Sequence, residues 1–188
     1  NLAQYQDLTV VSLVTNPENL FDPDTGIYVT GNQYLDWKNS DAYNPDKSVW
    51  DTDNLTNYFS KGKEWEREAA LTVFQDGKAV VDQNIGIRIK GASSRNSAQK
   101  NFNLYARSTY GASKISYPLI PDNYAADGTL IDQYDSVSLR AVSEEGRLRD
   151  GFSQKLLTDR TNLTKQDMQS CVVFLNGEYW GLYEMTEK

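Results

Sequence analysis

Short stretches of alternating apolar and polar residues run through this chain, which is the pattern of strands buried on one face. Residues 66–74 alternate in this way, residues 79–81 and 85–90 follow them, and Asp76-Gly77 signals a hairpin between them. In the last stretch the isoleucines share one face and the basic residues share the other. The pattern therefore predicts antiparallel strands with one buried side.

Two further stretches, residues 8–14 and 171–175, are almost entirely apolar and predict strands buried within the fold. The dipeptide Asn176-Gly177 signals another hairpin, with a returning strand over residues 179–185. The two hairpin signals each join antiparallel strands. Strands are also predicted over residues 102–106 and 135–142.

One segment, residues 147–161, has a clear helical period. Leu148, Phe152 and Leu156 recur every four residues and form an apolar stripe along one side. Together these elements predict an α+β fold in which a predominantly antiparallel sheet carries one main helix. The length of 188 residues suits one domain, so residues 1–188 are expected to fold as a unit.

Residues 16–63 form an irregular excursion, rich in aspartate, turn residues and aromatic side chains. Stretches of this length are uncommon unless they are functional or pack on themselves. The excursion is therefore either a self-packed surface segment or an aromatic platform for sugars, and residues 64–188 carry the sheet and helix. Its main aromatic residues are Tyr28, Tyr34, Trp37, Tyr43, Trp50 and Tyr58.

Asp22 and Asp24 flank a proline just before Gly26, and this pair has two interpretations. Aspartate is a common turn former, which is the simpler explanation. Paired carboxylates are also ligands for Ca²⁺, although the spacing differs from that of an EF-hand loop. Calcium binding is therefore the second hypothesis for this turn.

The composition excludes several kinds of chemistry. There is no histidine, so a Ser-His-Asp triad, a Cys-His pair and a histidine-ligated metal are excluded. Cys171 is the only cysteine and is expected to be a buried apolar residue. The net charge of -7 disfavours nucleic acid and anionic lipid as partners, and no apolar run is long enough for a membrane span.

The best candidate for chemistry is the strand–loop–strand segment over residues 86–107. Small loop residues offer free N–H and hydroxyl groups, and nearby basic side chains neutralise phosphate charge. The segment therefore predicts phosphate binding, and the alternative is an ordinary exposed basic strand face. The candidate residues are Arg88, Lys90, Gly91, Ser93, Ser94, Arg95 and Lys100.

Asp150, at the start of the predicted helix, also has two explanations. A carboxylate is stabilised near the N-terminus of a helix by the helix dipole. In a kinase-like lobe, an acidic residue on the helix behind the sheet pairs with the phosphate-binding lysine. Asp150 or Glu144 fits that second role, and we prefer Asp150 because it lies within the amphipathic segment.

Three motifs in this order resemble the CotH kinase family, which is named for a spore coat protein. They read GIRIKGASSRNSAQKNFNLYAR, then SLRAV followed by RLRDGF, then VVFLNGEYWGLYEMTEK. The openings VSLVTNPENLFDPDTGIYVTG and KGKEWEREAALTVF resemble the longer secreted branch of the family, which includes cellulosome-associated bacterial proteins. The resemblance covers most of the chain.

The resemblance implies an atypical protein kinase that moves the γ-phosphoryl group of ATP to Ser or Thr, using Mg²⁺ or Mn²⁺. It implies a kinase N-lobe fold over this chain, with the small-residue loop facing the nucleotide. Either Lys90 or Lys100 would contact phosphate, and the family's basic pair is here Gln99-Lys100. Arg149-Asp150 matches the family's helix-start motif, and Glu187 would lie at the hinge, near the adenine.

In the family the metal-binding and catalytic aspartates follow in a second lobe, so we expect the catalytic lobe outside this chain and no catalytic residue within it. The expected partners are a protein substrate of unknown identity and that lobe. The alternative is a noncatalytic extracellular module that binds carbohydrate or protein, such as a polysaccharide or a cellulosomal protein. The expected location is extracellular or on the bacterial cell surface, with the spore coat as the alternative.

Overall fold

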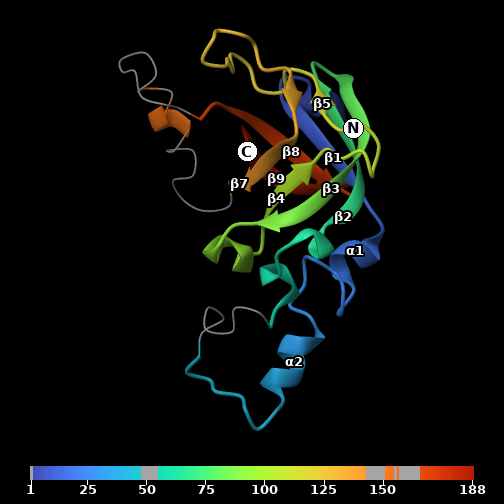
Figure 1. Ribbon diagram of the computed structural model, residues 1–188, viewed down its shortest axis with the longest axis vertical. Coiled ribbons are helices and arrows are strands. Elements are labelled where there is room, and N and C mark those ends of the chain that lie inside the picture. Colours follow the sequence, from blue (N-terminus) through green and yellow to red (C-terminus); the bar gives the residue numbers. More distant parts are fainter. Residues whose placement is uncertain (1, 48–54, 143–150, 155, 157–165) are drawn as a thin grey trace.

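The computed structural model describes residues 2–47, 55–142, 151–154, 156 and 166–188. Seven of the described strands close into a barrel (Figure 1) in the order β1-β2-β3-β4-β7-β9-β8. Neighbours in the barrel are antiparallel except β1 and β8, which run parallel. The strands are β1 (Thr9–Val14), β2 (Arg67–Gln75), β3 (Lys78–Lys90), β4 (Asn101–Tyr105), β7 (Ser136–Ala141), β8 (Met168–Leu175) and β9 (Glu178–Glu187).

Alternate residues of each strand point into the barrel and fill its core. On β3, Ile85, Ile87 and Ile89 are buried inside, as the alternation predicts. Cys171 on β8 is also buried in the core, and burial raises the pKa of its thiol. The prediction that Cys171 is a buried apolar residue is therefore confirmed.

The predicted sheet-rich α+β class is confirmed, and closure into a barrel is the added finding. Closure comes from the parallel pairing of β1 with β8, in which Thr9 lies opposite Cys171 and Leu13 opposite Leu175. This pairing explains why residues 8–14 and 171–175 are so apolar, since both strands have neighbours on each side and a face in the core. The two predicted stretches 79–81 and 85–90 are parts of the single strand β3.

Both predicted hairpins form. Asp76 and Gly77 between β2 and β3 have φ values of 50° and 71°. Asn176 and Gly177 between β8 and β9 have φ values of 50° and 84°. Two successive residues with positive φ are the requirement of a type I′ turn, and Asn-Gly and Asp-Gly are the pairs that adopt it most readily.

The excursion over residues 16–63 holds short helices and, within its described part, no strand. Asn16 accepts a hydrogen bond from the backbone N–H of Glu18 and so caps the first helix, whose N-terminal residue is proline. These short helices were not expected from the sequence pattern. They are α1 (Pro17–Phe21), α2 (Asn32–Lys38) and the 3₁₀ turns η2 (Asn57–Phe59) and η3 (Lys63–Trp65).

The excursion has one part on the barrel and one part away from it. Leu20 and Ile27 are buried in the core cluster, whereas α2 lies far from the strands at the lower end of the molecule (Figure 1). Asp22 Oδ1 accepts hydrogen bonds from the backbone of Thr25 and of Asp24, which lower the pKa of Asp22. Both aspartates thus serve the turn, and calcium binding there stays a prediction.

The remaining described elements are small. They are η1 (Leu2–Tyr5), η4 (Ser93–Asn96) and a two-stranded sheet of β5 (Ile115–Ser116) and β6 (Gln133–Tyr134). Of the predicted helix over residues 147–161, residues 151–154 and 156 are helical, and its other positions lie outside the described residues. None of the described helices is long and apolar enough to cross a membrane.

The closed barrel predicts that Leu13→Ala destabilises the protein strongly. Leu13 on β1 is fully buried, so the substitution leaves a cavity that costs about 2–5 kcal/mol of unfolding free energy. Leu8, five residues earlier and 40% exposed, is the matched control, and Leu8→Ala should cost about 0.5 kcal/mol or less. Urea denaturation of both variants measures the difference, and equal losses would contradict the barrel core.

Candidate functional site

The outer surface of the barrel over β3, β4, β7 and β9 is polar, and we call it the polar face. The strand register sets its outward side chains next to one another across the sheet. Side chains in the middle of this face are buried, whereas those along β3 remain partly exposed. Its members are Arg88, Lys90, Asn101, Asn103, Tyr105, Ser138, Arg140, Glu184 and Thr186.

Lys90 lies at the end of β3 among other positive charges. It is partly buried, and burial together with the charges of Arg140 and Lys188 lowers the pKa of its amine. Within the described residues, no carboxylate is close enough to form an ion pair with Lys90. Bringing like charges together is unfavourable, so an anion bound beside Lys90 would be stabilised there.

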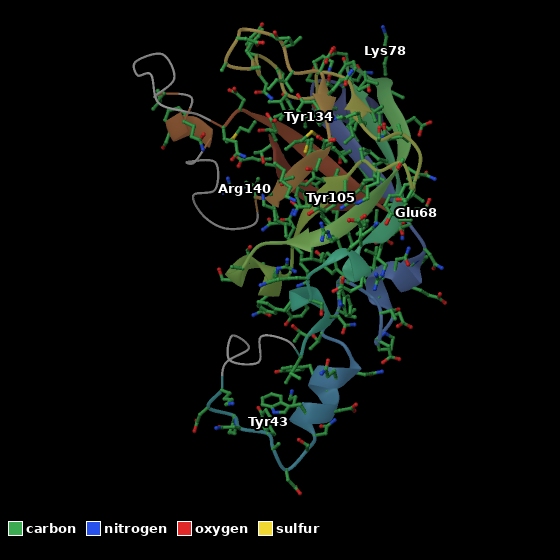
Figure 2. All side chains as sticks on the ribbon, viewed as in Figure 1. Tyr43, Glu68, Lys78, Tyr105, Tyr134 and Arg140 are labelled. Atoms are coloured by element: carbon green, nitrogen blue, oxygen red, sulfur yellow. The ribbon has the colours of Figure 1, made fainter. Side chains whose placement is uncertain are left out.

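The ring of Tyr105 holds basic side chains on this face (Figure 2). The guanidinium of Arg88 lies 4.1 Å from the ring centroid, and the ammonium of Lys188 lies 4.4 Å from it. Lys188 Nζ also donates a hydrogen bond to the Tyr105 hydroxyl at 2.8 Å, and Asn103 Nδ2 donates to the same oxygen at 3.2 Å. Cation–π contacts of this kind fix cations in place without neutralising them.

Glu66, just before β2, anchors the edge of the polar face. Its carboxylate is fully buried and accepts two hydrogen bonds from Arg107, at 2.7 and 3.0 Å. Arg88 Nε lies 3.4 Å from the same carboxylate. Gly86 on β3 makes room for Glu66, because a Cβ at position 86 would collide with its carboxylate. The bidentate pair with Arg107 fixes the Glu66 carboxylate, and the charge of Arg88 lies beside it without a hydrogen bond.

The loop between β3 and β4 is tightly fixed. Gly91 has a φ of 120°, and a Cβ there would collide with the Ser94 hydroxyl. The Ser94 hydroxyl accepts a hydrogen bond from Asn101 Nδ2 at 3.0 Å. Ser93 is exposed on η4, next to Ser94. The loop therefore has one conformation in which glycine is needed at its start.

Arg95 points away from the polar face and binds the excursion. Its Nε donates to the carbonyl of Gly91 at 2.7 Å, and its Nη1 donates to the carbonyls of Tyr58 and Ser60, both at 3.0 Å. The side chain is buried, so these backbone carbonyls accept the hydrogen bonds that water would accept from an exposed arginine. Arg95 thus ties the loop to η2 and is not brought together with Lys90.

Lys100 is also separated from Lys90. Its ammonium donates to the carbonyls of Arg95 at 2.7 Å and Ser97 at 3.0 Å, and it lies 4.1 Å from the centroid of the Tyr58 ring. Burial lowers the pKa of Lys100 to about 8. The sequence left Lys90 and Lys100 as alternatives for the lysine that contacts phosphate. The two differ in location, because Lys90 lies on the polar face and Lys100 lies beneath the loop.

The last two predicted site residues lie elsewhere. Glu187 is at the end of β9, where its carboxylate accepts a hydrogen bond from Asn123 at 3.3 Å on the side opposite the polar face. Glu184, three residues earlier on the same strand, faces the opposite side, which is the polar face. Asp150 and Glu144 lie outside the described residues.

Sequence reasoning missed several residues of this site. Arg140 was within the predicted strand 135–142, and alternation with the core residue Leu139 would have put it on the polar side. No such signal was present for Glu66, Arg107 and Lys188. These residues lie at or beyond strand ends, and only the folding of the barrel brings them to this site.

The donor set of the polar face suits phosphate better than a metal ion. Its partly exposed groups are cations, amides and hydroxyls, which donate to phosphate oxygens. Mg²⁺ and Mn²⁺ need carboxylate oxygens, and the described residues contain no group of three or more Asp, Glu, Cys or His side chains that could hold a metal ion. The face therefore does not fit a divalent cation by itself.

Comparison with known proteins places the second half of the chain in a family. Residues 87–188 match the family described as CotH kinase protein. The matched region begins within β3 and includes the loop, β4, β7, β8 and β9, and so includes most of the polar face. A search of curated proteins found no match to the chain.

The buried position of Lys100 predicts a pH-dependent contribution to stability. Its pKa is about 8 in the folded protein and near 10.5 in the unfolded chain, so the unfolded state binds more protons between these values. The unfolding free energy of the native protein, relative to that of Lys100→Met, should therefore rise from pH 8 to pH 10.5. Denaturation at several pH values measures this, and a flat difference would contradict the burial of the ammonium.

Proposed function

The chain belongs to the CotH kinase family, and we propose that its polar face binds the phosphate groups of ATP. In this proposal the chain is the nucleotide-binding part of an atypical protein kinase that transfers the γ-phosphoryl group to Ser or Thr of a protein. The observation that carries it is the partly buried Lys90, set among positive charges without a carboxylate partner in the described part of the chain.

Two cations of the polar face and the adjoining loop have parts in the proposed binding. The Lys90 ammonium donates to a phosphate oxygen, and Arg140 supplies further positive charge across the sheet. The fixed loop that starts at Gly91 follows Lys90 directly and offers backbone N–H groups and the Ser93 hydroxyl to the same phosphate. Phosphoryl transfer depends mainly on positioning and charge neutralisation, which these groups supply.

The remaining parts of the proposed kinase stay predictions. Mg²⁺ or Mn²⁺ would accompany ATP and neutralise phosphate charge, and its protein ligands are expected in the second lobe, outside this chain. Asp150 would pair with the phosphate-binding lysine, and the backbone near Glu187 would recognise the adenine amine. Because the polar face carries no catalytic aspartate pair, we expect this chain alone to bind nucleotide without transferring phosphate.

A specific observation also supports the alternative, a noncatalytic extracellular module. Trp37 on α2 packs between Tyr34 and Tyr43, with ring centroids 5.7 and 5.1 Å apart, on the part of the excursion that lies away from the barrel (Figures 1 and 2). Tyr43 is exposed and Trp37 and Tyr34 are half-buried, so ring faces of this cluster are open to stack on the apolar faces of sugars. Trp50, another aromatic residue of the excursion, lies outside the described residues.

The nucleotide proposal predicts that Lys90→Met weakens ATP binding about tenfold, because a charge-assisted hydrogen bond to phosphate is lost. Lys78→Met is the matched control, since Lys78 is exposed on the hairpin between β2 and β3, far from the polar face (Figure 2). Calorimetric titration with ATP, with and without Mg²⁺, measures both variants. Equal affinities of the two variants, or no binding by the native chain, would refute the proposal.

The alternative predicts that the protein has no affinity for nucleotide and that Trp37→Ala abolishes its retention on an insoluble polysaccharide such as cellulose. The residue lies on the detached part of the excursion, so its loss should not affect the barrel. A pull-down assay with Tyr124→Ala as the control compares the two, since Tyr124 is an exposed aromatic residue elsewhere. Unchanged retention, or none by the native protein, would count against sugar binding.

A further inference from the structure

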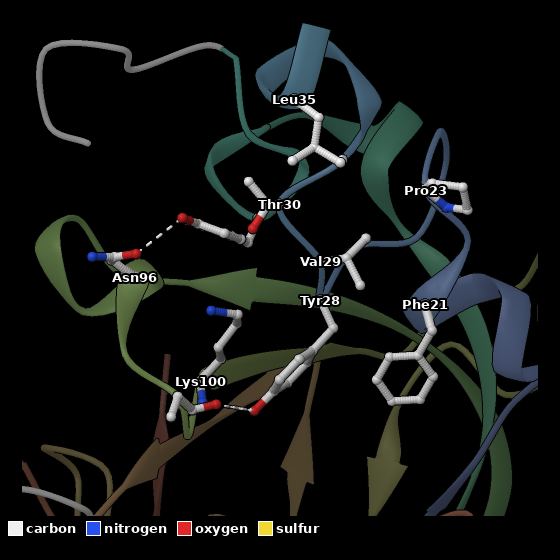
Figure 3. A pocket seen from close by; sticks show the side chains of 11 residues that line it. Phe21, Pro23, Tyr28, Val29, Thr30, Leu35, Asn96 and Lys100 are labelled. Atoms are coloured by element: carbon white, nitrogen blue, oxygen red, sulfur yellow. Dashed lines mark hydrogen bonds between the residues drawn. The ribbon is translucent and has the colours of Figure 1, made fainter. Parts of the chain in front are cut away.

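A second concave site lies between the excursion and the loop that joins β3 to β4 (Figure 3). Its volume is about 550 Å³, which is within the range of small-molecule pockets. One wall comes from residues 21–35 and the other from the loop residues Asn96, Ala98 and Lys100. The whole of the first wall lies outside residues 87–188, the region that matches the kinase family.

The excursion makes the first wall apolar. Phe21, Pro23, Val29 and Leu35 line it. Phe21 is 46% exposed and Leu35 is 45% exposed, so two large apolar side chains stand open to solvent at the mouth of the pocket. Apolar groups gathered around a concavity are typical of ligand sites, because a ligand removes them from water.

The opposite end of the pocket carries a single charge, that of Lys100. Figure 3 shows its nitrogen directed into the space between Asn96 and Tyr28. An ammonium has three N–H donors, and two of them are used by the carbonyls of Arg95 and Ser97. Apart from the Tyr58 ring, whose centroid lies 4.1 Å away, no acceptor among the described residues takes the third donor, which is therefore available to a ligand oxygen.

The charge of Lys100 has no opposite charge beside it. Among the described residues, no carboxylate lies within ion-pair distance of its ammonium, although the residue is only 5% exposed. Buried charges are usually paired with an opposite charge. The groups that face Lys100 are the neutral rings of Tyr28 and Tyr58 and the backbone carbonyls of the loop. A bound anion would supply the missing partner.

We propose that this pocket binds a small organic acid, with its apolar body against Phe21, Val29 and Leu35 and its carboxylate on Lys100. The geometry assigns the two ends of the ligand separately, because the apolar wall and the ammonium lie on opposite sides of one cavity. The site is distinct from the polar face, which contains Lys90, so the two proposals stand or fall independently.

The matching probe is 3-phenylpropionate, which has an aromatic body and a terminal carboxylate. Its neutral counterpart is 3-phenylpropionamide, which has the same shape without the charge. Titration of the ¹⁵N-labelled protein with each compound, followed by NMR, should shift the amide signals of Val29, Leu35 and Ala98. The acid should bind about tenfold more tightly than the amide, which is the effect of one charge-assisted hydrogen bond.

Two substitutions of the exposed residue Leu35 test the preference for a carboxylate without disturbing the fold. Leu35→Glu and Leu35→Gln remove the same apolar surface, but only Glu repels a carboxylate. Affinity for the acid should fall further in Leu35→Glu than in Leu35→Gln, and affinity for the amide should fall equally in both. In Lys100→Met, where the variant folds, the acid and the amide should bind alike.

The result that overturns the proposal is equal affinity of the native protein for the acid and the amide. The same conclusion follows if neither compound shifts the pocket signals at concentrations up to about 10 mM, well above the millimolar Kd of a weak site. Affinity for the acid should also decrease as the pH rises through about 8, because Lys100 loses its charge there. Binding that stays constant across that range would place the carboxylate elsewhere.

Discussion

The parallel pairing of β1 with β8 is the contact on which the rest of the fold depends. Every other pair of neighbours in the barrel is antiparallel, whereas this parallel pair closes the sheet on itself. Closure leaves no open sheet edge and fixes which side of each strand faces inward. The polar side chains of β3, β4, β7 and β9 lie on the outer face because the apolar side chains on the other side of these strands pack in the core.

Two lysines of the same segment have opposite surroundings. Lys90 projects from the barrel wall among cations and remains partly exposed, so its charge is available to an anion from solution. Lys100 turns beneath the loop, where two carbonyls and the Tyr58 ring surround it. The difference follows from strand parity at the end of β4, where Asn101 points outward and Lys100 does not. One chain segment thereby serves two separate sites.

The excursion contributes to the molecule in two ways. Through Tyr28 and Tyr58 it holds the loop, since Tyr28 donates to the carbonyl of Ala98 and Tyr58 donates to the side chain of Asn96. Its other part carries the Trp37 ring cluster away from the barrel. A loop clamped by these contacts loses little conformational entropy when it binds a ligand, which favours affinity.

The alternation of apolar residues was sufficient to predict the strands, and Asp76-Gly77 and Asn176-Gly177 were sufficient to predict both hairpins, because these signals act between residues close in sequence. The family was likewise readable from the motifs around Gly91 and Asn176. Only the tertiary structure decided that the sheet closes, that Arg140 and Lys188 join Lys90, and that Lys100 lies buried in a pocket with Phe21 and Leu35. Those outcomes depend on contacts between residues distant in the chain, whose register no local pattern specifies.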